Sequence, residues 1–141
     1  MRFLDANIFI YAYYKPKRQL SQKEKQMKDY AKKIVNDISQ GKEEVVTTVV
    51  HLSEIVNILK HSISPEQLTN IILGLFMLKN VKIYSVSEKA YFAATELGAD
   101  LKLDPNDALA IDFMYLNNLK EIYSFDEDFD KVKGIERLPK L

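Results

Sequence analysis

Short apolar segments alternate with longer amphipathic segments along almost the whole of this 141-residue sequence. The short segments are rich in β-branched and aromatic residues, which are typical of buried strands. We expect strands at residues 2–4, 45–48, 81–86 and 121–124, with 135–138 as a further candidate. The alternation predicts an α/β fold of three layers, in which a mostly parallel central sheet is flanked by helices.

The longer segments carry apolar residues at helical spacing and begin at residues that favour helix caps. Ser21 with Glu24 has the pattern of a capping box, and Ser64 is followed by Pro65 at the first helical position. We expect helices over residues 7–14, 21–41, 52–61, 64–79, 87–98 and 105–118. Gly98 is expected to close the fifth of them.

Composition narrows the class of protein further. Hydrophobic residues make up 47% of the sequence, which is enough for a single domain, residues 1–141, with a sizeable core. The absence of cysteine excludes disulfides, thiolate zinc sites and a cysteine nucleophile. The longest apolar candidate, residues 71–78, is far shorter than the ~20 residues of a membrane span. Because a strand begins almost at once and leaves no room for a signal peptide, we expect a cytoplasmic protein.

Five carboxylates lie where an expected strand or helix begins or ends, embedded in apolar sequence: Asp5, Glu54, Asp107, Asp126 and Asp128. Carboxylates avoid such positions unless they are paired or bind a cation, because removing a charge from water is costly. Ligands of an open parallel sheet bind beyond the carboxyl ends of its strands. We therefore expect these acids to converge at one rim, in an oxygen-only site suited to Mg²⁺ or Mn²⁺.

Each of these residues also has an ordinary structural interpretation. Asp5 and Asn7 both suit a helix N-terminal cap, although their oxygens can also ligate a cation and orient a water. An acid at Asp107 stabilises a helix dipole by ~0.3–1 kcal/mol. Glu54 can be a solvent-facing glutamate, and the acids after Ser124 can be loop residues, with the Ser124 hydroxyl bonded within that loop.

Four segments, in their order along the chain, together resemble the motifs of the PIN-domain nucleases and, within them, the VapC toxins of toxin–antitoxin pairs. The segments are Phe3-Leu4-Asp5-Ala6-Asn7-Ile8, Ser53-Glu54-Ile55, Asp107-Ala108-Leu109-Ala110-Ile111 and Ser124-Phe125-Asp126-Glu127-Asp128-Phe129. The departures are mild: Ser124 stands where the family usually has threonine, and a basic, insertion-like stretch follows Tyr14. The resemblance spans nearly the whole chain.

The resemblance implies a Mg²⁺- or Mn²⁺-dependent endoribonuclease that hydrolyses RNA phosphodiester bonds through a metal-activated water. Asp5, Glu54, Asp107 and Asp126 would be its catalytic, metal-binding acids, and Asp128 a supporting metal ligand. The resemblance also implies that the protein is a toxin that binds a small antitoxin protein, and we expect it to form a homodimer.

Charge is unevenly distributed, although the formal net charge is zero. Between positions 15 and 33 the sequence has only two acids but eight basic residues: Lys15, Lys17, Arg18, Lys23, Lys25, Lys28, Lys32 and Lys33. A basic segment beside an acidic pocket suits RNA held near a cation site, and Lys15, Lys17 and Arg18 are the candidate RNA-binding residues. The ordinary alternative is a solvated, lysine-rich helix surface.

Two apolar segments are candidate partner surfaces. The helix over residues 68–78 is unusually apolar, and Tyr11, Tyr13 and Tyr14 lie close together near the first helix. Core packing is the ordinary interpretation of both. We expect an antitoxin to lay an apolar helix or strand across one of them and to direct an arginine toward the acids, because a guanidinium pairs with two carboxylate oxygens at once.

Three other functions stay open. An aspartyl-nucleophile phosphatase also carries an aspartate after its first strand, but Asn7 stands where such enzymes place a second aspartate, and no later lysine motif is evident. A non-catalytic PIN domain that binds only RNA or protein is expected to lose its acids, whereas an RNA-processing nuclease that is not a toxin keeps them. His51 and His61 are expected to be core or surface histidines.

Overall fold

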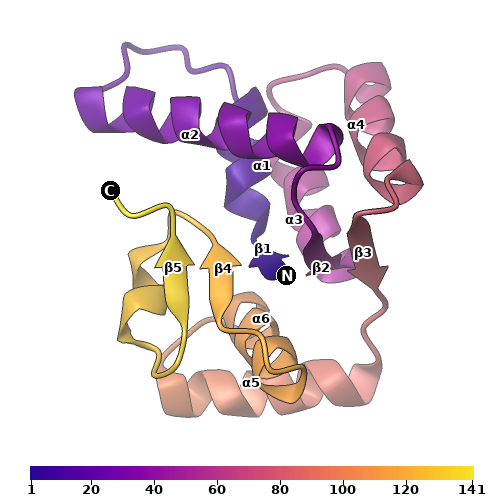
Figure 1. The fold of residues 1–141 in the computed structure, drawn as a ribbon, viewed down its shortest axis with the longest axis vertical. Helices are drawn as coiled ribbons and strands as arrows, with labels where there is room; N and C mark the ends of the chain where they lie inside the picture. The colour runs from indigo at the N-terminus through magenta and orange to yellow at the C-terminus, as the bar shows by residue number, and fades with distance from the viewer.

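The computed structural model describes residues 1–141 and contains one five-stranded sheet. Its strands are β1 (Arg2–Leu4), β2 (Val45–Thr48), β3 (Val81–Tyr84), β4 (Glu121–Tyr123) and β5 (Glu136–Leu138), in the order β3-β2-β1-β4-β5. All neighbouring strands are parallel, which confirms the predicted α/β fold with helices around a parallel sheet (Figure 1).

Helices cover both faces of the sheet. One face carries α1 (Ala6–Tyr13), α2 (Gln22–Ser39), α3 (Val49–Leu59) and α4 (Pro65–Met77), and the other carries α5 (Glu88–Leu101) and α6 (Pro105–Leu116). Figure 1 shows the two groups on opposite sides of the strands. The chain moves outward from β1 to β3 and then reverses to β4, and since parallel crossovers are right-handed, the reversal moves the connecting helices to the opposite face.

The sheet divides the core in two because successive strand residues point to opposite faces. The α1–α4 side buries Leu4, Val45, Val81 and Tyr123. The α5–α6 side buries Phe3, Val46 and Ile122, together with Phe129 from the 3-10 helix η1 (Glu127–Lys131) that joins β4 to β5. Both faces of the strands are therefore apolar, so the polar groups of the site are confined to the strand ends.

Helix α5 does not end at Gly98, which corrects the prediction that this glycine closes it. The helix continues to Leu101 and ends at Lys102, whose φ of 57° is left-handed. Gly98 instead allows α6 to approach closely, because a Cβ atom here would lie 2.7 Å from the Leu103 carbonyl oxygen and 3.2 Å from the Ala108 Cβ atom. Since α6 carries Asp107, this close contact also helps to set where that acid lies.

Gly98→Ala is expected to destabilise the protein by about 1–3 kcal/mol, because the added methyl group meets a backbone oxygen that cannot move away freely. The matched control is Gly74→Ala in α4, where nothing lies within 4 Å of an added Cβ. That change is expected to be neutral or to stabilise by up to about 1 kcal/mol, through helix propensity. Urea unfolding of both variants measures the difference, and equal effects would contradict the close-contact interpretation.

Several other element boundaries differ from those expected, most of them by one or two residues. Helix α3 begins three residues early, at Val49, because the Thr48 hydroxyl accepts a hydrogen bond from the His51 backbone N–H and caps the helix. Strand β3 ends at Tyr84, two residues early, where its pairing with β2 ends. None of the helices combines the length and the apolar character needed to cross a bilayer.

Candidate metal centre

Asp5 lies directly after β1 and is both a helix cap and a buried acid of the candidate site. One carboxylate oxygen accepts from the Ala6 backbone N–H at 2.8 Å, and the other accepts from the Ser124 hydroxyl at 2.6 Å. Only 4% of the residue is exposed. The capping interpretation of Asp5 is therefore correct, and it is compatible with a place at the carboxyl edge of the sheet.

Strands β1 and β4 are neighbours, although they are far apart in the sequence, and polar side chains join their ends. The Ser124 hydroxyl accepts from the Asp126 backbone N–H at 3.0 Å and from the Asn7 side-chain amide at 3.3 Å. The Asn7 amide oxygen accepts from the Phe125 backbone N–H at 3.2 Å. This junction is where the strand order reverses, the position at which parallel sheets commonly bind ligands.

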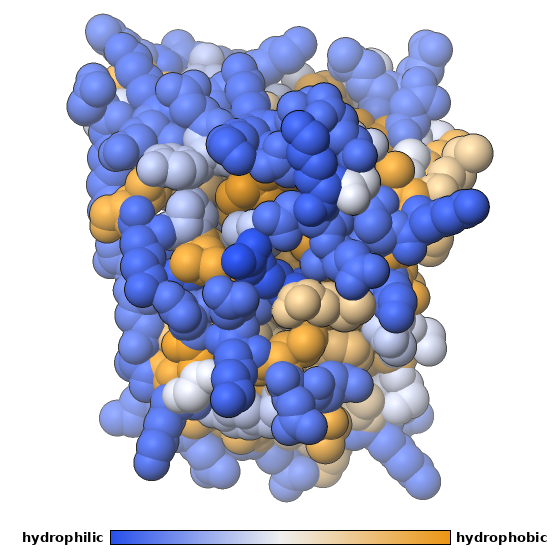
Figure 2. Space-filling view, in the orientation of Figure 1, coloured by the Kyte–Doolittle hydropathy of each residue, from blue (hydrophilic) through white to orange (hydrophobic).

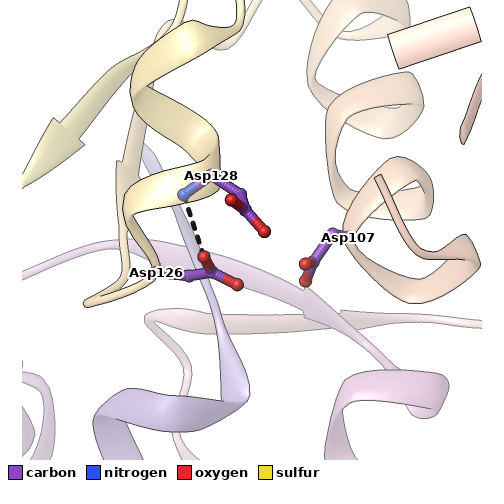
Figure 3. Close-up of side chains that lie close together, drawn as sticks. All are labelled: Asp107, Asp126 and Asp128. Carbon is purple, nitrogen blue, oxygen red and sulfur yellow. Dashed lines mark hydrogen bonds between the residues drawn. The ribbon is translucent and has the colours of Figure 1, made fainter. Parts of the chain in front are cut away.

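Asp107, Asp126 and Asp128 converge from two separate elements. Asp104 caps α6 by accepting from the Asp107 backbone N–H at 2.9 Å, and the Asp107 carboxylate points across to the start of η1 (Figure 3). There Asp126 accepts from the Asp128 backbone N–H at 2.9 Å. One carboxylate oxygen from each of the three acids lies within 4.8 Å of the others.

Glu54 comes from α3 and is half-buried rather than solvent-facing. Its Oε1 atom is shielded from solvent and has no hydrogen-bond partner. The charge of Asp5 acts on Glu54, and so does the charge of Asp104 more weakly, which indicates that Glu54 faces the same cluster. An acceptor atom buried without a donor is a place where a cation could bind.

Burial and mutual repulsion raise the pKa of three of these acids. Burial, opposed by the hydrogen bonds from Ser124 and Ala6, raises the pKa of Asp5 to about 6. Burial and then the charge of Asp5, opposed by the Asn106 side chain, raise the pKa of Glu54 to about 7. Burial, followed by the charges of Asp5, Asp104 and Asp126, raises the pKa of Asp107 to about 8. The raised pKa values indicate that no positive charge of the protein compensates the negative charge of these acids.

The donor set fits a hard divalent cation. All the converging groups are oxygens, the acids repel one another, and one acceptor atom is buried without a donor. Mg²⁺ and Mn²⁺ prefer such carboxylate ligands. The residues that could hold the cation are Asp107, Asp126 and Asp128, with Asp5 and Glu54 beside them.

Two residues next to the site were not among the predicted site residues. Asp104 caps α6, and its charge also acts on Asp5, Glu54 and Asp107. Arg137 comes from β5 and donates to the Ser124 carbonyl at 3.4 Å. The signal for Asp104 was its spacing of three residues from Asp107, whereas nothing local to Arg137 in the sequence indicated its place.

The predicted RNA-binding residues Lys15, Lys17 and Arg18 lie exposed in the connection between α1 and α2. No hydrogen bond or ion pair joins them to the five acids, and Arg18 is instead paired with Glu24 at 2.6 Å. Lys28, from the same basic segment, donates to the Tyr11, Ala12 and Tyr14 carbonyls at the end of α1. Part of the basic segment therefore has a structural role.

The family model described as PIN domain matches residues 2–135, and the chain therefore belongs to the PIN-domain family. No curated protein matches the sequence. Among solved structures, the chain resembles VapC20 of Mycobacterium tuberculosis, a toxin described as cleaving the sarcin–ricin loop, with a TM-score of 0.68 and 15% identity over 92% of this chain and 93% of that one.

Two further structures similar to this chain are toxin–antitoxin assemblies. A toxin–antitoxin complex from Klebsiella pneumoniae matches with a TM-score of 0.65 and 16% identity, over 96% of each chain. VapBC2 from Rickettsia felis, bound to a DNA fragment from its promoter, matches with a TM-score of 0.62 and 17% identity, again over 96% of each chain. At these identities the likeness is one of fold.

Proposed function

We propose that this PIN-domain protein is a Mg²⁺- or Mn²⁺-dependent endoribonuclease and the toxin of a toxin–antitoxin pair. The observation that carries the proposal is the convergence of Asp107, Asp126 and Asp128 beside Asp5 and Glu54 at the reversal point of the sheet. The fold shared with VapC toxins supports it.

The five acids would hold the cation, with Asp5, Glu54, Asp107 and Asp126 as the catalytic group and Asp128 as a supporting ligand. A bound divalent cation activates an attacking water and neutralises charge on the phosphodiester. The Ser124 hydroxyl orients the Asp5 carboxylate through its 2.6 Å bond. Asn7 holds the Phe125 backbone and so keeps the end of β4 against β1.

The direct test is cleavage of single-stranded RNA by the purified protein. We expect no cleavage in EDTA and recovery on addition of Mg²⁺ or Mn²⁺ in excess, because the site contains only oxygen donors. A zinc-only or metal-independent activity is not expected from this donor set. Undiminished cleavage in EDTA would contradict the metal-dependent mechanism, and no cleavage under any condition would favour a non-catalytic PIN domain.

The exposed basic segment is the candidate surface for RNA outside the acid cluster. Replacing Lys15, Lys17 and Arg18 by glutamine is expected to weaken RNA binding and to reduce the slope of log K against log salt by up to about 2, because fewer counterions are released. The control carries the same charge change at the exposed residues Lys79, Lys82 and Lys89. An equal salt slope in both triple variants would show that residues 15–18 are merely solvated.

A hollow of about 340 Å³ between α1, α2 and α4 is the candidate antitoxin surface, lined by Phe9, Tyr13, Val35, Ile38, Ile71 and Leu75 among others. Leu73, Phe76 and Met77 are exposed on α4. Figure 2 shows hydrophilic side chains over α2 and apolar ones on the side of α4. These features support an antitoxin that contributes an apolar helix or strand, and the same apolar area supports a homodimer of the free toxin. An arginine of the antitoxin would pair with the acids of the cluster, because a guanidinium pairs with two carboxylate oxygens at once.

The antitoxin proposal is tested by co-expression with a short neighbouring gene. Growth arrest by the toxin alone, its relief by the neighbour and a complex that co-purifies are the expected results. Growth arrest that persists with no complex would favour an RNA-processing PIN nuclease that is not a toxin.

A further inference from the structure

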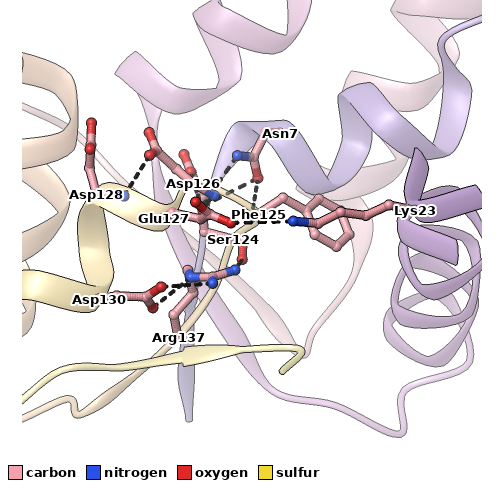
Figure 4. Close-up of polar contacts among 10 residues, drawn as sticks. Asn7, Lys23, Ser124, Phe125, Asp126, Glu127, Asp128, Asp130 and Arg137 are labelled. Atoms are coloured by element: carbon pink, nitrogen blue, oxygen red, sulfur yellow. Dashed lines mark hydrogen bonds and ion pairs between the residues drawn. The ribbon is translucent and has the colours of Figure 1, made fainter. Parts of the chain in front are cut away.

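Arg137 on β5 makes a two-pronged ion pair with Asp130 of η1. Its Nε atom donates to Asp130 Oδ1 at 2.8 Å, and its Nη2 atom donates to Asp130 Oδ2 at 2.9 Å. Its Nη1 atom donates to the Ser124 carbonyl at 3.4 Å (Figure 4). Only 12% of the Arg137 side chain is exposed, whereas 53% of the Asp130 side chain is exposed, so the pair is shielded from solvent on the arginine side.

These contacts join the two ends of the segment that carries two of the clustered acids. Ser124 directly follows β4, and Asp130 lies within η1. Asp126 and Asp128 lie between them, on the side that faces Asp107 (Figure 3). Arg137 therefore connects both ends of the segment that carries Asp126 and Asp128 to strand β5, which is paired with β4 in the sheet.

No other cation holds this segment as firmly. Lys23 from α2 pairs with Glu127 at 3.3 Å, but its side chain is 62% exposed and that of Glu127 is 71% exposed. Exposed pairs of this kind restrain little. The Ser124 hydroxyl and Asn7 restrain the beginning of the segment. At its far end the buried Phe129 ring and the Lys131–Lys102 hydrogen bond act together with Arg137, which is the only one of them that also contacts Ser124 at the beginning.

We propose that Arg137 and Asp130 form a positioning pair that holds Asp126 and Asp128 opposite Asp107 in the geometry required to bind a divalent cation. This inference rests on the proposed metal-dependent function. The planar guanidinium fixes both carboxylate oxygens of Asp130 and also reaches the Ser124 carbonyl, whereas the point charge of a lysine cannot make all three contacts at once. Arg137 touches none of the five acids through a hydrogen bond and is not a catalytic residue.

The experiment measures Mn²⁺ binding to the full chain by titration calorimetry, with thermal unfolding in EDTA as a separate readout. Arg137→Lys and Asp130→Asn are each expected to weaken Mn²⁺ binding by about 10-fold or more, as loss of a residue that orients metal ligands does. The double variant should bind no more weakly than the worse single variant, because each change breaks the same contact. The control is Lys140→Gln, which removes the exposed Lys140–Glu136 pair beyond the same strand and should leave Mn²⁺ affinity unchanged.

Arg137→Met separates positioning from electrostatics, because the two predict opposite signs. Removing a positive charge near the acids should tighten Mn²⁺ binding if Arg137 acts only through its charge, and should weaken it if Arg137 positions the segment. Unchanged or tighter binding by folded Arg137→Lys and Arg137→Met would overturn the inference and leave the proposed function standing. If Arg137→Met does not fold, the Mn²⁺ affinities of Arg137→Lys and Asp130→Asn test the inference instead. Failure of the parent protein to bind Mn²⁺ would overturn both proposals together.

Discussion

Asp107→Asn is expected to reduce RNA cleavage by more than about 100-fold while the protein stays folded. Asp107 is the acid that α6 contributes to the cluster with Asp126 and Asp128. Its replacement therefore removes a charged oxygen from that cluster. Residues that only orient metal ligands already cost about 10–100-fold when they are changed, and a ligand should cost more. Single-turnover cleavage of a defined RNA in Mg²⁺ measures the effect.

The same variant is expected to be as stable as the parent protein, or more stable, in EDTA at pH 8. Losing the acid at the start of α6 costs about 0.3–1 kcal/mol of helix-dipole stabilisation. The pKa of Asp107, raised to about 8 by burial and three neighbouring charges, indicates that relief of repulsion is the larger effect. Asp104, not Asp107, caps the helix, so the cap remains.

Asp112→Asn is the matched control, since Asp112 lies on the same helix outside the cluster. It should leave cleavage almost unchanged. Clear loss of stability in Asp107→Asn with cleavage retained would assign Asp107 a structural role instead. Asp5→Asn is a poorer probe, because an amide cannot accept from both the Ala6 backbone N–H and the Ser124 hydroxyl, so it should also cost stability.

Without metal, the free energy of unfolding is expected to fall as the pH rises from about 5 to about 8. The pKa values of Asp5, Glu54 and Asp107 are about 6, 7 and 8 in the folded protein, against ordinary values of 3.8, 4.5 and 3.8. Across this window these three acids bind more protons in the folded state than in the unfolded state, so raising the pH favours unfolding. Buried His51, whose pKa is lowered to about 4, opposes them only below its ordinary value of 6.5. Each group should contribute on the order of 1 kcal/mol, because water screens the half-buried ones.

Saturating Mg²⁺ or Mn²⁺ is expected to reverse this trend. The cation binds the ionised acids of the folded state and competes with protons, so it should raise the unfolding temperature more at pH 8 than at pH 6. Urea unfolding in EDTA at pH 5, 6, 7 and 8, and thermal unfolding with and without the cation, measure the two effects. Asp107→Asn should show a shallower pH dependence. A stability in EDTA that rises toward pH 8 would contradict the raised pKa values.

The sequence was sufficient to predict the fold class and the general place of the acids. Alternation of strands and helices implies parallel pairing, because each helix returns the chain to the start of the next strand. Parallel pairing in turn brings the residues after each strand to one edge, where Asp5 and Ser124 are found. The helix caps Ser21 and Ser64 could also be predicted from the sequence, because they depend on contacts between residues only three positions apart.

The remaining features of the fold and of the site depend on contacts between segments that are distant in the sequence. The sequence could not indicate that Gly98 serves the approach of α6 rather than the end of α5, because the atoms that exclude a side chain there belong to another helix. The sequence could not show whether the Glu54 side chain is half-buried or exposed to solvent, because the same helical pattern of apolar residues fits both cases. The raised pKa values, the partnering of Arg18 with Glu24, and the place of Arg137 beside Ser124 all depend on packing. Local sequence determines which elements form and where they begin, whereas burial and charge at the site depend on residues that only the folded chain brings together.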